Sequence, residues 1–212
     1  MLWFLLMDST KSDSRAHWVW SAAVGRALLG ALLLAAASTL ADAAWALWNL
    51  RHRPLYGLIH GTLLLLVFGV YLGALGRTKR SFLLGLLGGP AAGIAAASSF
   101  YLLARFLRYS AMFAAWALLW ILLGILARFV VPVGQSWRQT LLRGVAAALL
   151  SGLAFYGISD IWLKPSPGGP NYVYHFLCWT WAFLPGFLAL LFRNSVIAPN
   201  GPSVKRSDRR SC

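Results

Sequence analysis

Six long apolar stretches alternate with short polar segments along the chain. They run approximately over residues 22–48, 55–75, 82–104, 109–131, 140–163 and 173–192. A helix of about 20 apolar residues spans the roughly 30 Å hydrocarbon core of a bilayer. Because a backbone in lipid must pair its polar groups within the segment, each stretch is expected to be an α-helix. The pattern predicts an all-α polytopic membrane bundle of six transmembrane helices.

The composition agrees with this prediction. The 212 residues are 59% hydrophobic and 11% charged, with a mean hydropathy of +0.68. Soluble globular domains carry about 25% charged residues, so that class is excluded. We therefore divide the chain into a polar cytoplasmic lead (1–20), the bundle (21–193) and a basic cytoplasmic tail (194–212).

The basic residues predict the orientation of the bundle. With both termini cytoplasmic, fourteen of the 19 bases lie inside and five lie outside. The five outer bases are Arg51, Arg53, Arg105, Arg108 and Lys164. Cytoplasmic loops carry the excess of Lys and Arg, so this orientation is preferred, and the plasma (inner) membrane is the expected location.

The formal net charge of +14 does not indicate nucleic-acid binding. The bases lie mostly at the ends of apolar stretches and, apart from the tail, form no surface patch of the kind that follows a phosphate backbone. No phosphate loop and no paired Cys or His metal motif is present, so no cofactor and no metal is expected. The expected partners are membrane lipids and a small hydrophobic ligand.

The first stretch has an alternative interpretation as a signal peptide. Residues 27–37 would be its apolar core, and Ala41-Asp42-Ala43 its cleavage site. However, the apolar run continues through Trp48, and the segment before the core would be unusually long. We therefore favour a retained transmembrane helix.

The acidic residues point to a functional site. All five are Asp, and only Asp42 and Asp160 lie within apolar stretches. In each case a His follows early in the next stretch, namely His60 and His175. An ionisable residue inside a membrane segment is costly and is the default place to look for function.

Helical spacing adds aromatic residues and hydroxyls to these ionisable residues. Asp42 shares a face with Ser38, Thr39 and Trp45, and Asp160 shares one with Tyr156. We predict an outward-facing pocket that binds or translocates a small hydrophobic or weakly charged molecule. Its predicted lining residues are Asp42, His60, Tyr156, Asp160, Tyr172, His175 and Trp179.

Three alternatives remain open for these residues. Asp160 and His175 could be the acid–base pair of a lipid-modifying membrane enzyme. Two Asp and two His could also hold a metal. In a purely structural protein, each Asp would only satisfy a neighbouring cation or His.

Glycine spacing predicts close helix packing. Gly57/Gly61 and Gly69/Gly73 are GxxxG pairs, and Gly85, Gly89 and Gly93 follow at steps of four. Small residues at this spacing let helix backbones approach each other. The Gly85/Gly89/Gly93 face could join a homo- or hetero-oligomer, which would suit a partner subunit of a membrane complex.

The first and last hairpins, 21–77 and 138–193, show a possible parallel repeat. An Arg precedes the Asp by 16 residues in the first hairpin and by 17 in the last, and a His follows in both. Parallel repeats place binding sites at their interface. We therefore expect Asp42, His60, Asp160 and His175 to lie at one depth, with at least one hydrogen-bonded Asp–His pair.

The predicted orientation can be tested with reporter fusions. A cytoplasmic reporter should be active after Gly76 and an exported reporter after Pro167, because the excess of bases holds the first loop inside. The opposite pattern would invert the topology.

Overall fold

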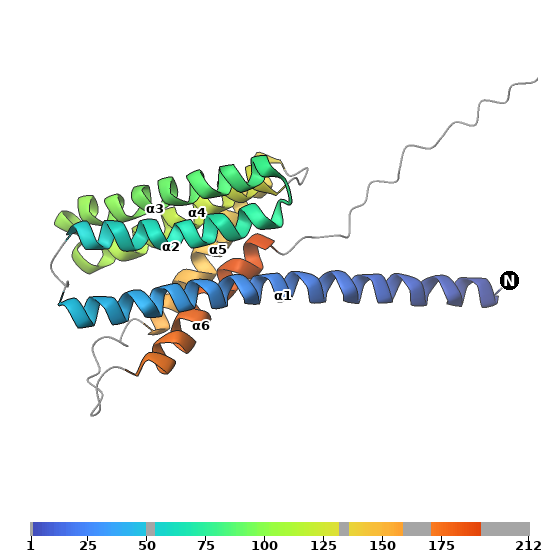
Figure 1. Cartoon of the computed structure of the whole chain (residues 1–212). Helices are drawn as coiled ribbons and strands as arrows, with labels where there is room; N and C mark the ends of the chain where they lie inside the picture. The colour runs from blue at the N-terminus through green and yellow to red at the C-terminus, as the bar shows by residue number, and fades with distance from the viewer. Residues whose placement is uncertain (1, 50–53, 132–135, 159–170, 192–212) are drawn as a thin grey trace, which may run out of the picture.

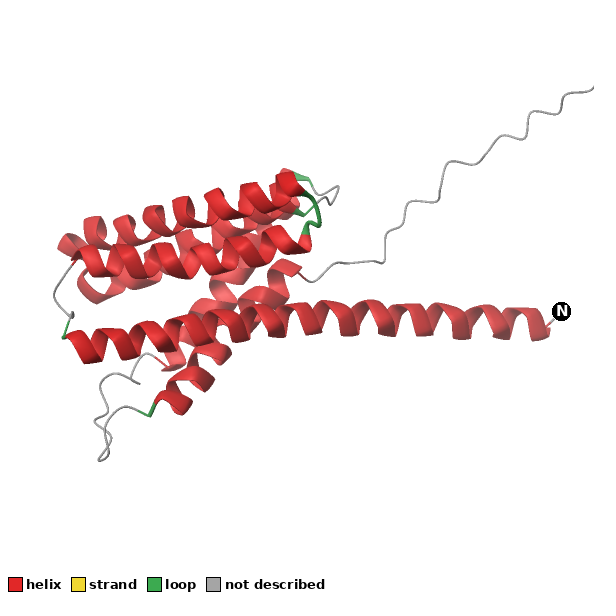
Figure 2. Ribbon diagram, viewed as in Figure 1, coloured by secondary structure: helices red, strands yellow, loops and turns green. Residues whose placement is uncertain are grey.

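The computed structural model describes residues 2–49, 54–131, 136–158 and 171–191, with side chains from residue 21 onward except that of Tyr109. These residues form helices and turns without a strand (Figures 1 and 2). The helices are α1 (Leu2–Trp48), α2 (Pro54–Leu75), α3 (Lys79–Leu107), the 3₁₀ turn η1 (Arg108–Ser110), α4 (Ala111–Val130), α5 (Trp137–Ile158) and α6 (Tyr172–Leu191). Among the described residues, six helices are long and apolar enough to cross a membrane. The six predicted stretches of spanning length are thus confirmed as helices.

Polar caps set three helix starts that hydropathy does not define. The Thr78 hydroxyl accepts the Ser81 N–H at 3.0 Å, so α3 begins at Lys79, three residues before the predicted stretch. Ser136 and Gln139 form a reciprocal capping box at the start of α5. Asn171 Oδ1 accepts the Tyr174 N–H at 3.1 Å and caps α6.

Helix α1 is longer than its predicted span. It runs for 47 residues from Leu2, and the part suited to a membrane begins at Ser21. Its first turns extend well beyond the other helices (Figure 1). The helix therefore continues through the boundary that the sequence analysis placed at residue 20.

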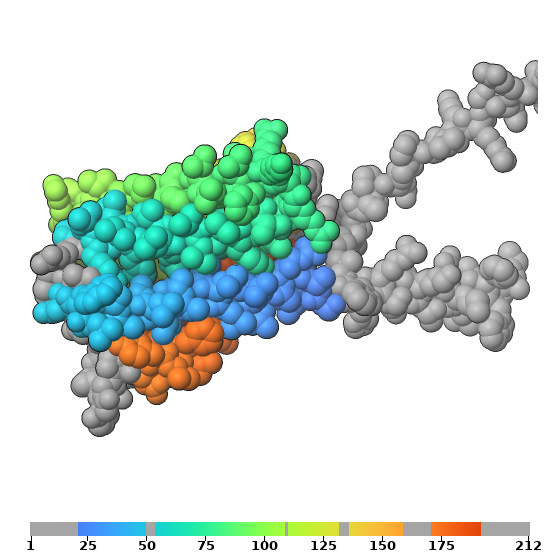
Figure 3. Space-filling model, in the orientation of Figure 1, coloured from blue at the N-terminus to red at the C-terminus, as the bar shows by residue number. Residues whose placement is uncertain are grey.

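The helices pack in the order in which they occur along the chain. α2 packs on α3, α3 on α4, α4 on α5 and α5 on α6, and α6 then packs extensively against α1. The contact between α1 and α2 is smaller than any of these. In Figure 3, α1 lies along α2 on one side and α6 on the other. The first and last hairpins therefore meet through α1 and α6.

Glycine backbones make the contact between α2 and α3. A Cβ at Gly85 would collide with the Gly69 carbonyl oxygen, and one at Gly89 with that of Leu65. A Cβ at Gly93 would lie 2.5 Å from the Gly61 carbonyl oxygen. The glycines thus mediate close packing as predicted, but within the chain. Helix α2 covers the face that carries Gly85, Gly89 and Gly93. The predicted oligomer through this face stays a prediction.

Aromatic rings fill the centre of the bundle around Phe187 of α6. Phe187 packs against Phe68 of α2 at 4.9 Å and edge-on against Trp120 of α4 at 5.6 Å between ring centroids. A Cβ at Gly30 of α1 would lie 2.5 Å from the Phe187 ring, so only glycine fits opposite it. Phe187 therefore joins α1, α2, α4 and α6 in one core.

Adding a single methyl group should test the contact between α2 and α3. We expect Gly89→Ala to lower the free energy of unfolding by about 1–3 kcal/mol, because the new Cβ would meet the Leu65 carbonyl. Gly25→Ala is the matched control, since nothing lies within 4 Å of a Cβ there. Reversible unfolding in mixed micelles would measure both variants. Equal stability of the two would contradict this packing.

Candidate functional site

The Asp42 carboxylate is buried between α1 and α6. The residue is 8% exposed, and its Oδ2 accepts the Trp179 Nε1–H at 2.8 Å. His175 Nδ1 lies 3.1 Å from the same oxygen. These contacts confirm the expected hydrogen-bonded Asp–His pair, formed here by Asp42 and His175.

Local structure explains why both partners come from α6. His175 and Trp179 are four residues apart and therefore share one face of that helix. The Asn171 cap starts the helix just before His175, whose backbone N–H bonds the Asn171 carbonyl at 3.0 Å. On α1, the small residues Ala31 and Ala35 are fully buried in the core of the bundle.

The arrangement suits an ionised carboxylate. Trp179 Nε1 can only donate, so it requires Asp42 Oδ2 to accept. If His175 also donates from Nδ1, its Nε2 carries the lone pair and can act as a base or acceptor. Among the described residues, no donor reaches Oδ1 of Asp42. Asp42 Oδ2 thus contacts both side chains of α6, and Oδ1 can accept a further donor.

Helix α2 brings His60 and Tyr56 to the same region. The Tyr56 hydroxyl donates to the Ala41 carbonyl at 3.0 Å, next to Asp42 in the chain. Its ring lies 5.8 Å from Trp45 and 6.3 Å from His60 between centroids. His60 therefore lies beside Tyr56, whose hydroxyl bonds the residue before Asp42. The predicted convergence of His60 with Asp42, Asp160 and His175 stays a prediction.

Three polar groups near Asp42 on α1 lack a partner. The hydroxyls of Ser38 and Thr39 and the Trp45 indole N–H are buried and make no hydrogen bond to any described residue. The Trp120 indole N–H of α4 is a fourth such group. Ser38 is only 1% exposed. Buried polar groups in native proteins are nearly always paired, so each such exception needs an explanation. The position of the three α1 groups next to Asp42 suggests that a bound molecule or water supplies the missing bonds.

An aromatic stack adjoins the site through Trp179. It consists of Trp116 of α4, Phe155 of α5, and Trp179 and Phe183 of α6, whose ring planes lie within about 25° of parallel. The Trp116 N–H donates to Ser151 Oγ at 3.1 Å, and Ser151 donates to the Ala182 carbonyl at 2.6 Å. The stack is thereby fixed at one end, and its four rings are buried against one another. Only Trp179 of this group was among the predicted site residues.

The other predicted residues have different positions. Tyr172 lies edge-on to His175, with ring centroids 6.0 Å apart. Tyr156 is 68% exposed and lies against Phe113 of α4. Asp160 lies outside the described residues, so its proposed pairing with His175 stays a prediction. No group of three or more metal-binding side chains occurs within the described ranges.

Comparison of the chain with known protein families, curated proteins and solved structures finds no match. The site must therefore be interpreted from its own chemistry. That chemistry is a buried carboxylate with two N–H donors, a second imidazole nearby, and unpaired hydroxyls beside flat aromatic rings.

Removing the Asp42 carboxylate should destabilise the contact between α1 and α6. We expect Asp42→Ala to lower the free energy of unfolding by about 1–3 kcal/mol, because Trp179 and His175 would be buried without an acceptor. The matched control is Ser99→Ala, whose hydroxyl bonds only the Ala96 carbonyl of its own helix at 2.7 Å. Thermal and denaturant unfolding would measure both. An Asp42→Ala protein as stable as this control would show that the hydrogen bonds contribute little.

Proposed function

We propose that this protein is a multi-pass membrane protein that binds a small amphiphilic molecule bearing a positive charge or a hydrogen-bond donor. The observation that carries the proposal is the Asp42 carboxylate, buried in an apolar bundle with both of its hydrogen bonds on one oxygen. A carboxylate that served only to join two helices could be replaced by a neutral acceptor. Ionisable residues are retained in membranes mainly where they bind or move something.

The polar end of such a ligand would lie at Asp42 Oδ1. An ammonium or hydroxyl donor there would complete the coordination of the carboxylate. The hydroxyls of Ser38 and Thr39 could accept further donors, and the Trp45 N–H could donate to a ligand oxygen. This would satisfy the buried polar groups that lack partners.

The apolar end would lie against aromatic rings. Trp179 belongs both to the hydrogen-bonded group and to the aromatic stack, so polar and apolar contacts adjoin each other. Trp45 and Tyr56 supply a second aromatic surface on the side of α2. Flat rings near a single charged group are typical of sites for small organic molecules and favour cations over anions.

The predicted topology gives the ligand a route. With cytoplasmic termini, Asp42 would lie near the outer end of α1, within about 10 Å of the outer interface at 1.5 Å per residue. An amphiphile could then enter from the outer leaflet. Transport would require a second, inward-open arrangement, whereas binding alone requires only this one.

A series of three ligands with one apolar tail tests the proposal. Equilibrium dialysis of hexylamine, hexanol and hexanoate would compare nanodiscs with and without the protein. We expect hexylamine to bind at least about tenfold more tightly than hexanoate, a difference of about 1.4 kcal/mol. Asp42→Asn should remove this preference while leaving the hexanol affinity nearly unchanged.

The Ser99→Ala control should keep the preference, because the Ser99 hydroxyl bonds only the backbone of its own helix α3. Two results would refute the proposal. One is equal binding of the three ligands by the wild type, as expected for a purely structural Asp42. The other is an amine preference that persists in folded Asp42→Asn protein.

A further inference from the structure

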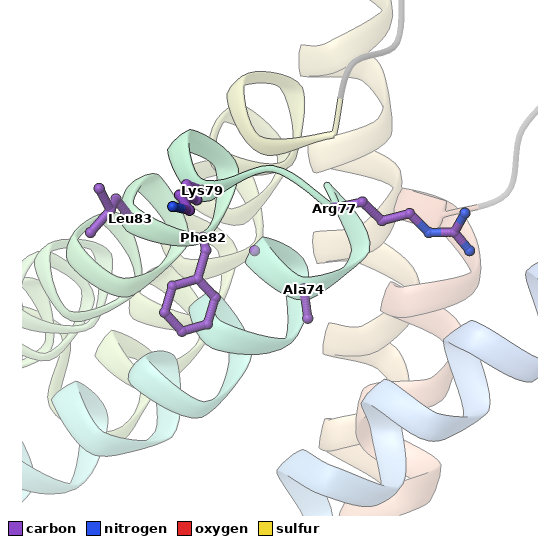
Figure 4. Close-up of a pocket in the computed structure, with 6 residues that line it drawn as sticks. Ala74, Arg77, Lys79, Phe82 and Leu83 are labelled. Atoms are coloured by element: carbon purple, nitrogen blue, oxygen red, sulfur yellow. The ribbon is translucent and has the colours of Figure 1, made fainter.

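A pocket of about 450 Å³ lies at the turn between α2 and α3, at the end of α2 opposite to Tyr56 and the Asp42 site. It is lined by Gly73, Ala74, Arg77, Lys79, Phe82 and Leu83. Figure 4 shows Lys79, Phe82 and Leu83 on one side of the turn, with the Arg77 side chain extending away from them. The pocket thus combines an apolar wall with a basic rim.

The basic rim has no acidic partner in the described structure. Arg77, Lys79 and Arg80 are all exposed. The chain has only five acidic residues, and Asp42 is the one whose side chain is described. Asp42 is bonded to α6 and therefore does not neutralise this rim. Counter-charge for these cations must come from outside the described part of the chain.

The helix start places two of these cations against the helix dipole. The Thr78 cap puts Lys79 and Arg80 in the first turn of α3. Positive side chains at a helix N-terminus oppose the positive end of the macrodipole, whereas an anion there is stabilised. An anionic group beside Lys79 would relieve both the mutual repulsion of the cations and this unfavourable position.

The apolar wall indicates that the anion carries a hydrocarbon chain. The side chains of Phe82 and Leu83 on α3 are 42% and 55% exposed. Both follow the basic turn directly and begin the membrane-spanning part of the helix. A phospholipid has the same order of parts, a charged phosphate followed by acyl chains. A soluble phosphate would use the basic rim and leave the wall empty.

We propose that this pocket binds an anionic phospholipid. Lys79 and Arg77 hold the phosphate, since an Arg fork matches phosphate geometry and the exposed Arg77 stem can rotate toward it. One acyl chain lies on Phe82 and Leu83, with Gly73 and Ala74 forming the floor. Basic pockets at the ends of transmembrane helices are known to select anionic headgroups.

Native mass spectrometry of the full chain, released from detergent with defined lipids, tests this site. The wild type should retain phosphatidylglycerol in preference to phosphatidylcholine. The double variant Arg77→Gln/Lys79→Gln should reduce that preference about tenfold or more, because each base near a membrane surface contributes about 1 kcal/mol.

The matched control is the double variant Arg105→Gln/Arg108→Gln, which lies at the opposite end of α3. It also removes two exposed bases, and Arg108 has a positive φ of 49° as Arg77 has one of 55°. This control should bind phosphatidylglycerol as the wild type does. The proposal is overturned if both double variants lose the same amount of lipid, or if neither loses any.

Glycerol 3-phosphate distinguishes a lipid from a soluble phosphate. It should not displace phosphatidylglycerol at equal concentration, because it lacks the chain that Phe82 and Leu83 would contact. Displacement would show that the headgroup alone is bound and would overturn the lipid assignment. The test is independent of the Asp42 site.

Discussion

A carboxylate inside an apolar bundle must be paired, and this constraint organises the contact between α1 and α6. Asp42 meets it with the Trp179 N–H and the His175 imidazole, which come from consecutive turns of α6. These two groups fix both the rotation of α6 about its axis and its register along α1. Because a slip of one turn would leave a charge and two polar groups buried and unpaired, the alternatives are strongly disfavoured.

Packing makes this pairing possible. Gly30 on α1 admits the Phe187 ring, and Gly186 on α6 admits Trp120. Helices of membrane-spanning length associate in hydrocarbon largely through such close van der Waals fits, because no hydrophobic drive acts between them there. The same principle operates between α2 and α3, where backbones rather than rings meet. The small contact between α1 and α2 leaves α6 as the main neighbour of α1.

The two ends of the bundle consequently differ in chemistry. One end holds the buried Asp42 carboxylate bonded by His175 and Trp179. The other holds the exposed bases Arg77, Lys79 and Arg80, together with a half-buried Arg128 that lies over the Trp137 ring at 4.5 Å. The proposed amphiphile would bind at the first end and the proposed phospholipid at the second.

The sequence alone determined the helices and the residues worth attention. Runs of about 20 apolar residues can be little else than helices of spanning length, because each must pair its own backbone. The rarity of acids within those runs singled out Asp42 and Asp160, and glycine spacing indicated which helix faces pack closely. The predicted helix starts were less accurate, because hydropathy does not reveal the capping hydrogen bonds at Thr78 and Ser136.

Tertiary structure decided which residues meet. The sequence suggested Asp160 as a partner of His175, and this pairing stays a prediction because Asp160 lies outside the described residues. The structure adds a contact that chain proximity did not indicate, because α6 packs on α1 and brings His175 to Asp42. Neighbourhood in sequence gives no information about such a contact, because 133 residues separate the two. For the same reason the glycine ladder could be assigned a packing role but not a partner, and that partner is α2 of the same chain. Periodicity defines the face that a helix presents, and only the three-dimensional packing decides what covers it.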